Sequence, residues 1–236
     1  MRTKVGFTLA EILITIGIIG VVAAMTLPAL ATKIQKKMTV AKLQKTFAEI
    51  SNAAKLAIDE SGGAIFEKND RMKSRERFQK YIEPHLKVSA TATLPGSKIY
   101  YQSSGARETM LNVMRSTGTE YTLLSGASII VSDDQAWSTP NKNGSVGISF
   151  LIDLNGYKNP PNKFGRDTFF MVINSELGPY LYYSDDGEAG TVQRTREQLI
   201  KGPSTCNYQC SKKGRGMWCG ALIQKDGWKI SKDYPW

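Results

Sequence analysis

The chain begins with a long apolar run, and this run limits what the rest of the sequence can be. Residues 7–30 carry one charged side chain, that of Glu11. As an α-helix the run would be about 36 Å long, enough to cross a hydrocarbon core of roughly 30 Å. The sequence therefore predicts a membrane-spanning helix at residues 7–30.

Glu11 is the unusual residue of this run, because an ionised carboxylate inside a bilayer costs about 2.5–3.5 kcal/mol on insertion scales. The preceding segment carries Arg2 and Lys4 and ends at Gly6. It is too short for an ordinary secretory signal, whose cleavage site follows the apolar core. Cleavage after Gly6 would create an α-amino group on Phe7, close to Glu11. The amine of a staggered neighbouring copy would serve equally well, which predicts a polymer.

This N-terminus resembles that of type IV pilins and type II secretion pseudopilins, in which a short basic leader precedes Gly, Phe-Thr-Leu-x-Glu and an apolar helix. The matching residues are Gly6, Phe7, Thr8, Leu9 and Glu11. The resemblance implies that a prepilin peptidase cuts between Gly6 and Phe7, that the Phe7 amine is methylated, and that Glu11 guides assembly. A plain signal anchor with an isolated glutamate is the alternative.

The resemblance also implies a location and partners. The protein would span the inner (cytoplasmic) membrane once, with its head outside the cytoplasm. It would then join copies of itself or other pilins in a helical fibre through an inner-membrane assembly platform, as a periplasmic pseudopilus or an extracellular pilus (fimbrium). Lysines cluster just after the span, at positions 33, 36, 37, 42 and 45, so the positive-inside rule alone does not predict this orientation.

An amphipathic stem follows the span. Its apolar side chains recur every three or four residues, which indicates one helical stripe: Val40, Leu43, Phe47, Ile50, Ala54 and Ala57. Pro28 predicts a kink or local melting near the end of the span, and the resemblance implies that this stretch bends or unwinds during assembly. Ser61-Gly62-Gly63 ends the stem. The predicted segments are a leader (1–6), a membrane and fibre-core helix (7–30), a stem (31–60) and a head (61–236).

The head reads as a short helix followed by strands. Residues 74–87 predict the helix, with a break near Pro84, and residues 194–201 a second short one. Apolar and β-branched stretches separated by turns predict strands at 98–102, 128–132, 146–154, 168–174, 181–184 and 217–223. Asp226-Gly227 predicts a hairpin from 217–223 into a last strand at 228–230. The fold class is therefore α+β, with a long N-terminal helix packed on an antiparallel sheet.

The segment 153–170 resembles the Asp-x-Asn-Gly, Pro-Asn, Gly-x-Asp run in the heads of many pilin-like proteins. Its residues build turns, and a purely structural loop is the first interpretation. The oxygens of Asp153, Asn155 and Asp167 could also converge on Ca²⁺, as in some pseudopilins. No other cofactor is expected.

Three cysteines lie near the C-terminus: Cys206, Cys210 and Cys219. Zinc favours four ligands and no histidine lies nearby, so a metal site is not expected. A disulfide joining Cys219 to Cys206 or Cys210 is the better interpretation, since type IV pilins commonly bridge a C-terminal loop. One thiol would be left over.

No catalytic motif predicts an enzyme, and the chain's single histidine, His85, has no partner motif. A structural pilus or pseudopilus subunit is the first interpretation. A net charge of +10 also permits a DNA-uptake pilin, although no interleaved arginine and aromatic pattern marks a nucleic-acid surface. A minor tip pseudopilin of a secretion system is the further alternative.

Overall fold

The computed structural model describes residues 6, 8–66, 72–94, 100–102, 110–112, 118–132, 147–175, 177–183, 193–204 and 207–236. The chain forms two compact units, Met1–Met38 and Thr39–Trp236. One continuous helix, α1 (Leu9–Ser61), runs through both. The division predicted from the sequence into leader, span, stem and head stays a prediction.

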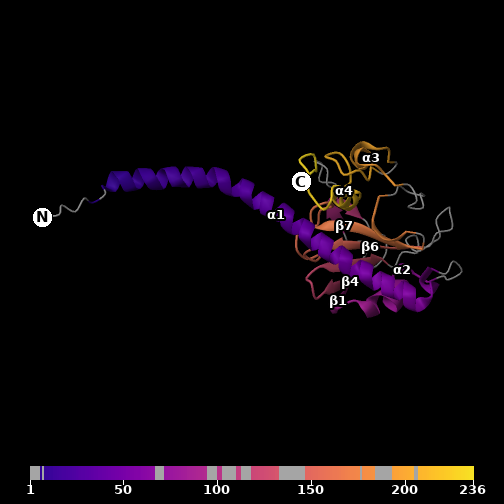
Figure 1. Cartoon of the computed structure of the whole chain (residues 1–236). Coiled ribbons are helices and arrows are strands. Elements are labelled where there is room, and N and C mark those ends of the chain that lie inside the picture. The colour runs from indigo at the N-terminus through magenta and orange to yellow at the C-terminus, as the bar shows by residue number, and fades with distance from the viewer. Residues whose placement is uncertain are drawn as a thin grey trace. The chain divides into compact units, whose positions relative to one another are not determined.

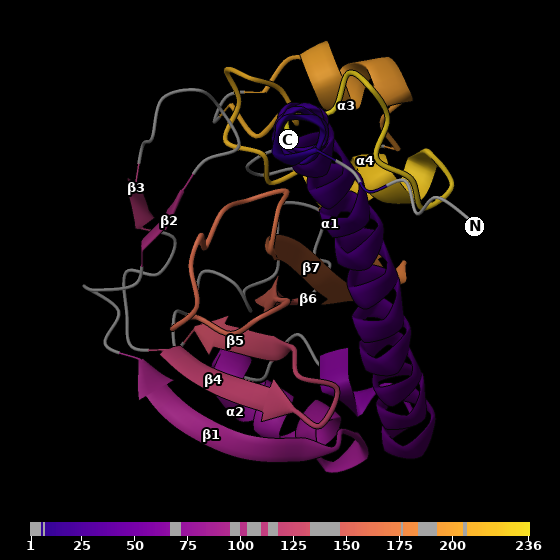
Figure 2. The same ribbon diagram turned by 90° about the vertical axis from the view of Figure 1, so that its left-hand side faces the viewer.

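The second unit is built on a six-stranded antiparallel sheet, in the order β1-β4-β5-β6-β7-β8 (Figures 1 and 2). Its strands are β1 (Val88–Leu94), β4 (Gly118–Leu123), β5 (Ser128–Ser132), β6 (Gly147–Asp153), β7 (Thr168–Asn174) and β8 (Gly178–Leu181). A separate two-stranded sheet pairs β2 (Tyr100–Gln102) with β3 (Met110–Asn112). With the stem packed into the same core, the predicted α+β fold class, a long helix with an antiparallel sheet, is confirmed.

Helices cover one face of this sheet. The register places Tyr121, Ile129, Ile152 and Phe169 side by side on that face. The ring of Phe78 lies 4.9 Å from that of Tyr121, and Gly220 of helix α4 (Cys219–Lys225) packs closely on Phe169. The predicted stem stripe is buried in the same core, apart from Phe47, which is half-buried against Trp228. Adjacent residues on the strands, Glu120 among them, face the other side.

The region after the stem differs in part from the prediction. The stem ends where Ser61-Gly62-Gly63 predicts, and a 3₁₀ turn, η1 (Ala64–Phe66), follows. The predicted helix at 74–87 is three short pieces, namely α2 (Ser74–Arg77), a π-helical turn η2 (Phe78–Ile82) and a 3₁₀ turn η3 (Glu83–His85). His85 is half-buried and its Nε2 lies 3.5 Å from Glu60 at the end of the stem. Helix α3 (Arg196–Lys201) lies within the predicted 194–201.

The predicted C-terminal hairpin is wrong. Residues 219–225 form helix α4, and residues 228–230 are not a strand. A short apolar run does not distinguish a buried strand from a buried helix by periodicity. Asp226-Gly227 ends the helix instead, because Gly227 adopts φ 70° and the Trp228 amide donates to the Ile223 carbonyl at 2.9 Å. This is the Schellman ending, in which glycine supplies the same positive φ that a hairpin turn requires.

Candidate assembly site and head loop

The first turn of α1 gives Glu11 a partner within its own chain. The Glu11 carboxylate accepts hydrogen bonds from the backbone amide and the hydroxyl of Thr8, both at 2.8 Å, and the Glu11 amide donates to the Thr8 hydroxyl at 3.3 Å. Thr8-Leu9-Ala10-Glu11 is therefore a capping box. This role was readable in the sequence as Thr-x-x-Glu but was not predicted. Gly6 precedes the helix and is exposed, while Phe7 lies outside the described residues.

Capping does not remove the charge of Glu11. From Thr8 to Ala31 the sequence contains no basic residue, so this part of the helix has no cation to offer the carboxylate. The two hydrogen bonds from Thr8 both go to one carboxylate oxygen, Oε2, and the formal charge of the group still favours a positive partner in apolar surroundings. Any cation that pairs with Glu11 would therefore come from outside residues 8–31.

The first half of α1 exposes its large apolar side chains. Leu9 and Met25 are each 75% exposed, and Leu13, Ile16 and Ile19 more than half exposed. Among the described residues, α1 is the one helix long and apolar enough to cross a membrane by length and composition. A helix that is apolar all round requires an apolar environment on every side.

Pro28 lies inside α1 without ending it. The helix is continuous from Leu9 to Ser61, so the predicted local melting is not seen. The hydroxyls of Thr26 and Thr32 donate to the carbonyls of Val22 and Pro28 one turn earlier, at 2.9 Å each. A role of Pro28 in assembly stays a prediction.

The loop between β6 and β7 is closed by its carboxylates. Asp167 accepts from the amides of Lys163 at 2.6 Å and Asn162 at 2.9 Å, one on each carboxylate oxygen. Asp153 accepts from the amide of Asn155 at 3.1 Å. Glu120, on the neighbouring part of the sheet, accepts from the amide of Tyr157 at 3.1 Å. These are side chain to backbone turns, as the structural interpretation predicts.

Asp153 is fully buried, and its environment favours the protonated form. Burial, and to a smaller extent the charges of Asp167 and Glu120, together raise the pKa of Asp153 to about 7 against the opposing hydrogen bond from Asn155. Burial likewise raises the pKa of Asp167. Three carboxylates converge here because β4, β6 and the loop meet at one end of the sheet.

The predicted calcium ligands meet only part of what the ion requires. Both oxygens of Asp167 already accept amide hydrogen bonds, whereas Asp153 Oδ2, Asn155 Oδ1 and Asn162 Oδ1 are buried with no hydrogen-bond partner. Among the described residues no group of three His, Cys, Asp or Glu side chains is placed to hold a metal. Any calcium site would therefore rely on amide oxygens and on Asp153, and calcium binding stays a prediction.

The loop packs against the C-terminus. The Tyr234 hydroxyl donates to the Gly165 carbonyl at 2.5 Å, and Arg166 lies over the ring of Trp236 at 5.1 Å. A side chain at Gly165 would meet the Tyr234 hydroxyl at 2.8 Å and the Cys219 sulfur at 2.9 Å, and its φ of 81° disfavours other residues. The stem also reaches this loop, since the Thr39 hydroxyl donates to the Arg166 carbonyl at 3.2 Å.

A disulfide joins Cys210 to Cys219, which is one of the two pairings predicted for Cys219. Both cysteines are fully buried. Cys206 lies outside the described residues. The disulfide ties the start of α4 to the preceding segment, beside Gly165.

Arg196 holds the C-terminal segment through contacts that sequence reasoning missed. Its guanidinium bonds Asp226 at 2.6 and 3.1 Å and Asp233 at 2.7 and 2.9 Å, and it also donates to Ser231. The hydrogen bonds from Arg196 and Ser231 lower the pKa of Asp233. Because these partners lie 30 to 37 residues away in sequence, no local pattern could have revealed them.

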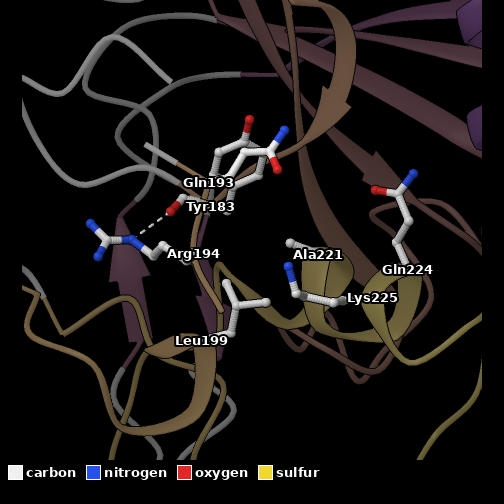
Figure 3. Close-up of a pocket in the computed structure, with 7 residues that line it drawn as sticks. All are labelled: Tyr183, Gln193, Arg194, Leu199, Ala221, Gln224 and Lys225. Carbon is white, nitrogen blue, oxygen red and sulfur yellow. Dashed lines mark hydrogen bonds between the residues drawn. The ribbon is translucent and has the colours of Figure 1, made fainter. Parts of the chain in front are cut away.

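A pocket of about 210 Å³ lies between α3, α4 and the segment after β8 (Figure 3). Arg194 donates from Nε to the Tyr183 carbonyl at 2.8 Å, and its guanidinium lies 4.3 Å from the ring centre of Trp218. The other lining residues are Gln193, Leu199, Ala221, Gln224 and Lys225. This lining contains no carboxylate, thiol or imidazole, so the pocket offers none of the usual acid–base or nucleophilic groups apart from lysine and tyrosine.

Together these observations define an α+β protein with an exposed apolar helix and a disulfide-bonded sheet domain. The model of a family of unknown function (DUF6613) matches residues 29–236, and the chain belongs to this family. The chain is also similar to a type IV major alpha-pilin of Moraxella bovis, with 35% identity over 99 residues. That alignment covers 42% of this chain and 57% of the pilin, so it spans little more than half of the relative. No solved structure matches the chain.

Proposed function

We propose that this protein is a structural subunit of a type IV pilus or a type II secretion pseudopilus, cleaved after Gly6 and polymerised through its N-terminal helix. The observation that carries the proposal is the exposed apolar half of α1, with one carboxylate in it, joined to a head with its own core. The similarity to a type IV major alpha-pilin supports it. The subunit would be made in the inner membrane with its head outside the cytoplasm.

Cleavage would supply what the chain lacks near Glu11. A new α-amino group on Phe7 is positive, and in a fibre the amine of one copy would pair with the Glu11 carboxylate of another. An ion pair in apolar surroundings costs far less than two separate charges. A prepilin peptidase and an inner-membrane assembly platform are the partners that this route requires. DNA uptake stays an alternative prediction.

Three variants separate charge pairing from helix capping. Glu11→Gln keeps a capping-box side chain but removes the charge, and Thr8→Ala removes the cap but keeps the charge. We expect Glu11→Gln to abolish fibre formation as fully as Glu11→Ala, and Thr8→Ala to leave most of it. The measurement is the yield of sheared fibres, with the membrane content of subunit as control. Fibre yield from Glu11→Gln equal to that of the unaltered chain would refute the pairing.

Cleavage is tested independently of assembly. Mass spectrometry of the native protein should show a chain beginning at Phe7 with a methylated amine. Replacing Gly6 with a bulky residue should leave residues 1–6 attached. A native protein that begins at Met1 would contradict the proposal at its first step.

A further inference from the structure

The two edges of the large sheet are protected differently. Strand β8 is a short edge and contains Pro179, which cannot donate a hydrogen bond. Strand β1 is a seven-residue edge with the sequence VSATATL, without charge or proline. Within the described residues β1 pairs only with β4, and its outer side is open in Figure 2. Proteins usually block such an edge with charges, proline, a bulge or a covering segment. Of these, β1 shows a register shift between Val88 and Ala90 at its start, and its pairing with β4 is regular from Ala90 to Leu94.

Strand β1 also differs from its neighbours in burial. Residues 89–93 are exposed, so side chains on both faces of the strand reach solvent, whereas β4 beside it is almost wholly buried. Only Leu94 is buried within β1. The core therefore does not require an uncharged sequence here. In a chain with 31 lysine and arginine residues, the lack of charge over this strand calls for another reason.

We propose that β1 is a pairing edge for the β1 strand of a second copy of this chain, antiparallel and centred on Thr91. In that register Thr91 lies opposite Thr91 of the other copy, and Ala90 opposite Ala92. Small residues meet small residues, and a cross-strand threonine pair is more favourable than an alanine pair. The outward N–H and C=O groups over residues 90–92 of both edges would be paired, between the two irregular positions at Ser89.

The charged residue nearest to β1 in the sequence does not oppose this contact. Lys87 is the exposed charged residue just before β1. Around a centre at Thr91 the two Lys87 residues lie at opposite ends of the pair, about 27 Å apart at ~3.4 Å per residue. This exceeds the Debye length of about 8 Å at physiological salt. The contact is small, so it is weak for one pair of heads. Where many heads are linked in one assembly, several such contacts formed together would bind more strongly through multivalency.

Cysteine cross-linking of the full-length chain in detergent tests the register. All variants carry Cys206→Ser, and a short bismaleimide is the cross-linker. Thr91→Cys places two thiols directly opposite each other, whereas Thr93→Cys, on the same face and also exposed, places them about 14 Å apart at ~3.4 Å per residue. Leu124→Cys, exposed in the turn after β4, reports random collisions.

We expect covalent dimer from Thr91→Cys at several times the yield of Thr93→Cys and Leu124→Cys. An Ala90→Cys/Ala92→Cys variant should also form dimer, and adding Thr91→Lys to it should remove most of that dimer. Equal yields at positions 91 and 93 would indicate another register or a parallel pair and overturn the proposal. A Thr91→Cys yield no higher than that of Leu124→Cys would overturn it too. Tryptophan fluorescence of each variant confirms that the head is folded, and neither result depends on fibre formation or on Glu11.

Discussion

The two halves of α1 belong to one unbroken helix, yet only the second half is buried by its own chain. Leu13 in the first half is 62% exposed, whereas Leu43 in the second is fully buried. Composition already distinguishes the two halves: residues 9–31 carry one charged side chain, Glu11, whereas residues 33–60 intersperse apolar residues with lysine, glutamate and aspartate. The second half has a narrow stripe that matches one face of the head, and the first is apolar all round. The difference indicates that the first half requires an apolar environment that the described part of its own chain does not supply.

Leucine truncation in each half is the strongest test of this comparison. Leu43→Ala should lower the free energy of unfolding of the head by about 2–5 kcal/mol, because it leaves a cavity in the core. Leu13→Ala should leave that free energy unchanged. The measurement is denaturant unfolding of the detergent-solubilised chain followed by tryptophan fluorescence. An equal loss from Leu13→Ala would show that the first half does contribute to head stability.

The strands were predicted correctly from the sequence where the local signals were strong. Strands β5 and β7 match residues 128–132 and 168–174 because these runs are β-branched or aromatic and end at turns. The strand predicted at 181–184 is instead β8 at 178–181, three residues earlier. Strand β1 was missed because Ser-Ala-Thr-Ala-Thr has little apolar alternation, and the start of β4 lay in residues 105–120, a stretch whose sequence is ambiguous between a strand and a short helix.

In the candidate site, the sequence predicted individual residues that stand out from their neighbours, but not the contacts between distant segments. Glu11 stood out as the one charge in an apolar run, and Asp153 and Asp167 as loop builders. The convergence of Glu120 on the same loop depends on the pairing of β4 with β5 and β5 with β6, which no local pattern specifies. The strand predicted at 98–102 overlaps β2, but residues 98 and 99 lie outside the described part of the chain.

The head, unlike the exposed first half of α1, holds a fully buried carboxylate, Asp153, and pH dependence sharpens the comparison there. Asp153 has a pKa of about 7 when folded and an ordinary value of 3.8. The folded state therefore binds this proton more tightly, and the contribution of Asp153 to stability is largest below about pH 4 and falls as pH rises to about 7. At about 1.4 kcal/mol per pKa unit the fall from this residue is up to about 4 kcal/mol.

Asp153→Asn should flatten this part of the stability profile, measured by denaturant unfolding from pH 4 to 8, and Asp59→Asn on the exposed stem is the control. Adding Ca²⁺ at pH 7.5 tests the cation prediction with the same protein. Binding would raise the melting temperature of the unaltered chain and not that of Asp153→Asn, because a cation stabilises the ionised carboxylate. No shift with Ca²⁺ relative to Mg²⁺ would favour the purely structural loop.

Loss of the Cys210–Cys219 disulfide should lower the stability of the head and leave the first half of α1 unaffected. Replacing both Cys210 and Cys219 with alanine should cost the head about 2–3 kcal/mol, because the covalent link restricts the unfolded chain. The first half of α1 contains no cysteine, so membrane insertion should be unaffected. Unfolding with and without dithiothreitol measures the effect. An unfolding free energy that reduction does not change would show that the loop at Gly165 holds this region without the link.

The smallest expected effect concerns the end of the chain. Arg196→Ala removes both carboxylate contacts of a side chain that is 40% exposed. Exposed pairs contribute little one by one, but a guanidinium shared by two carboxylates is a network, so we expect a loss of about 1–2 kcal/mol that shrinks in high salt. Arg196→Lys should recover only part of it, because lysine cannot bridge both carboxylates in the same geometry. Lys201→Ala, an exposed residue of the same helix, is the matched control, and an equal loss from it would mean that charge alone matters at α3.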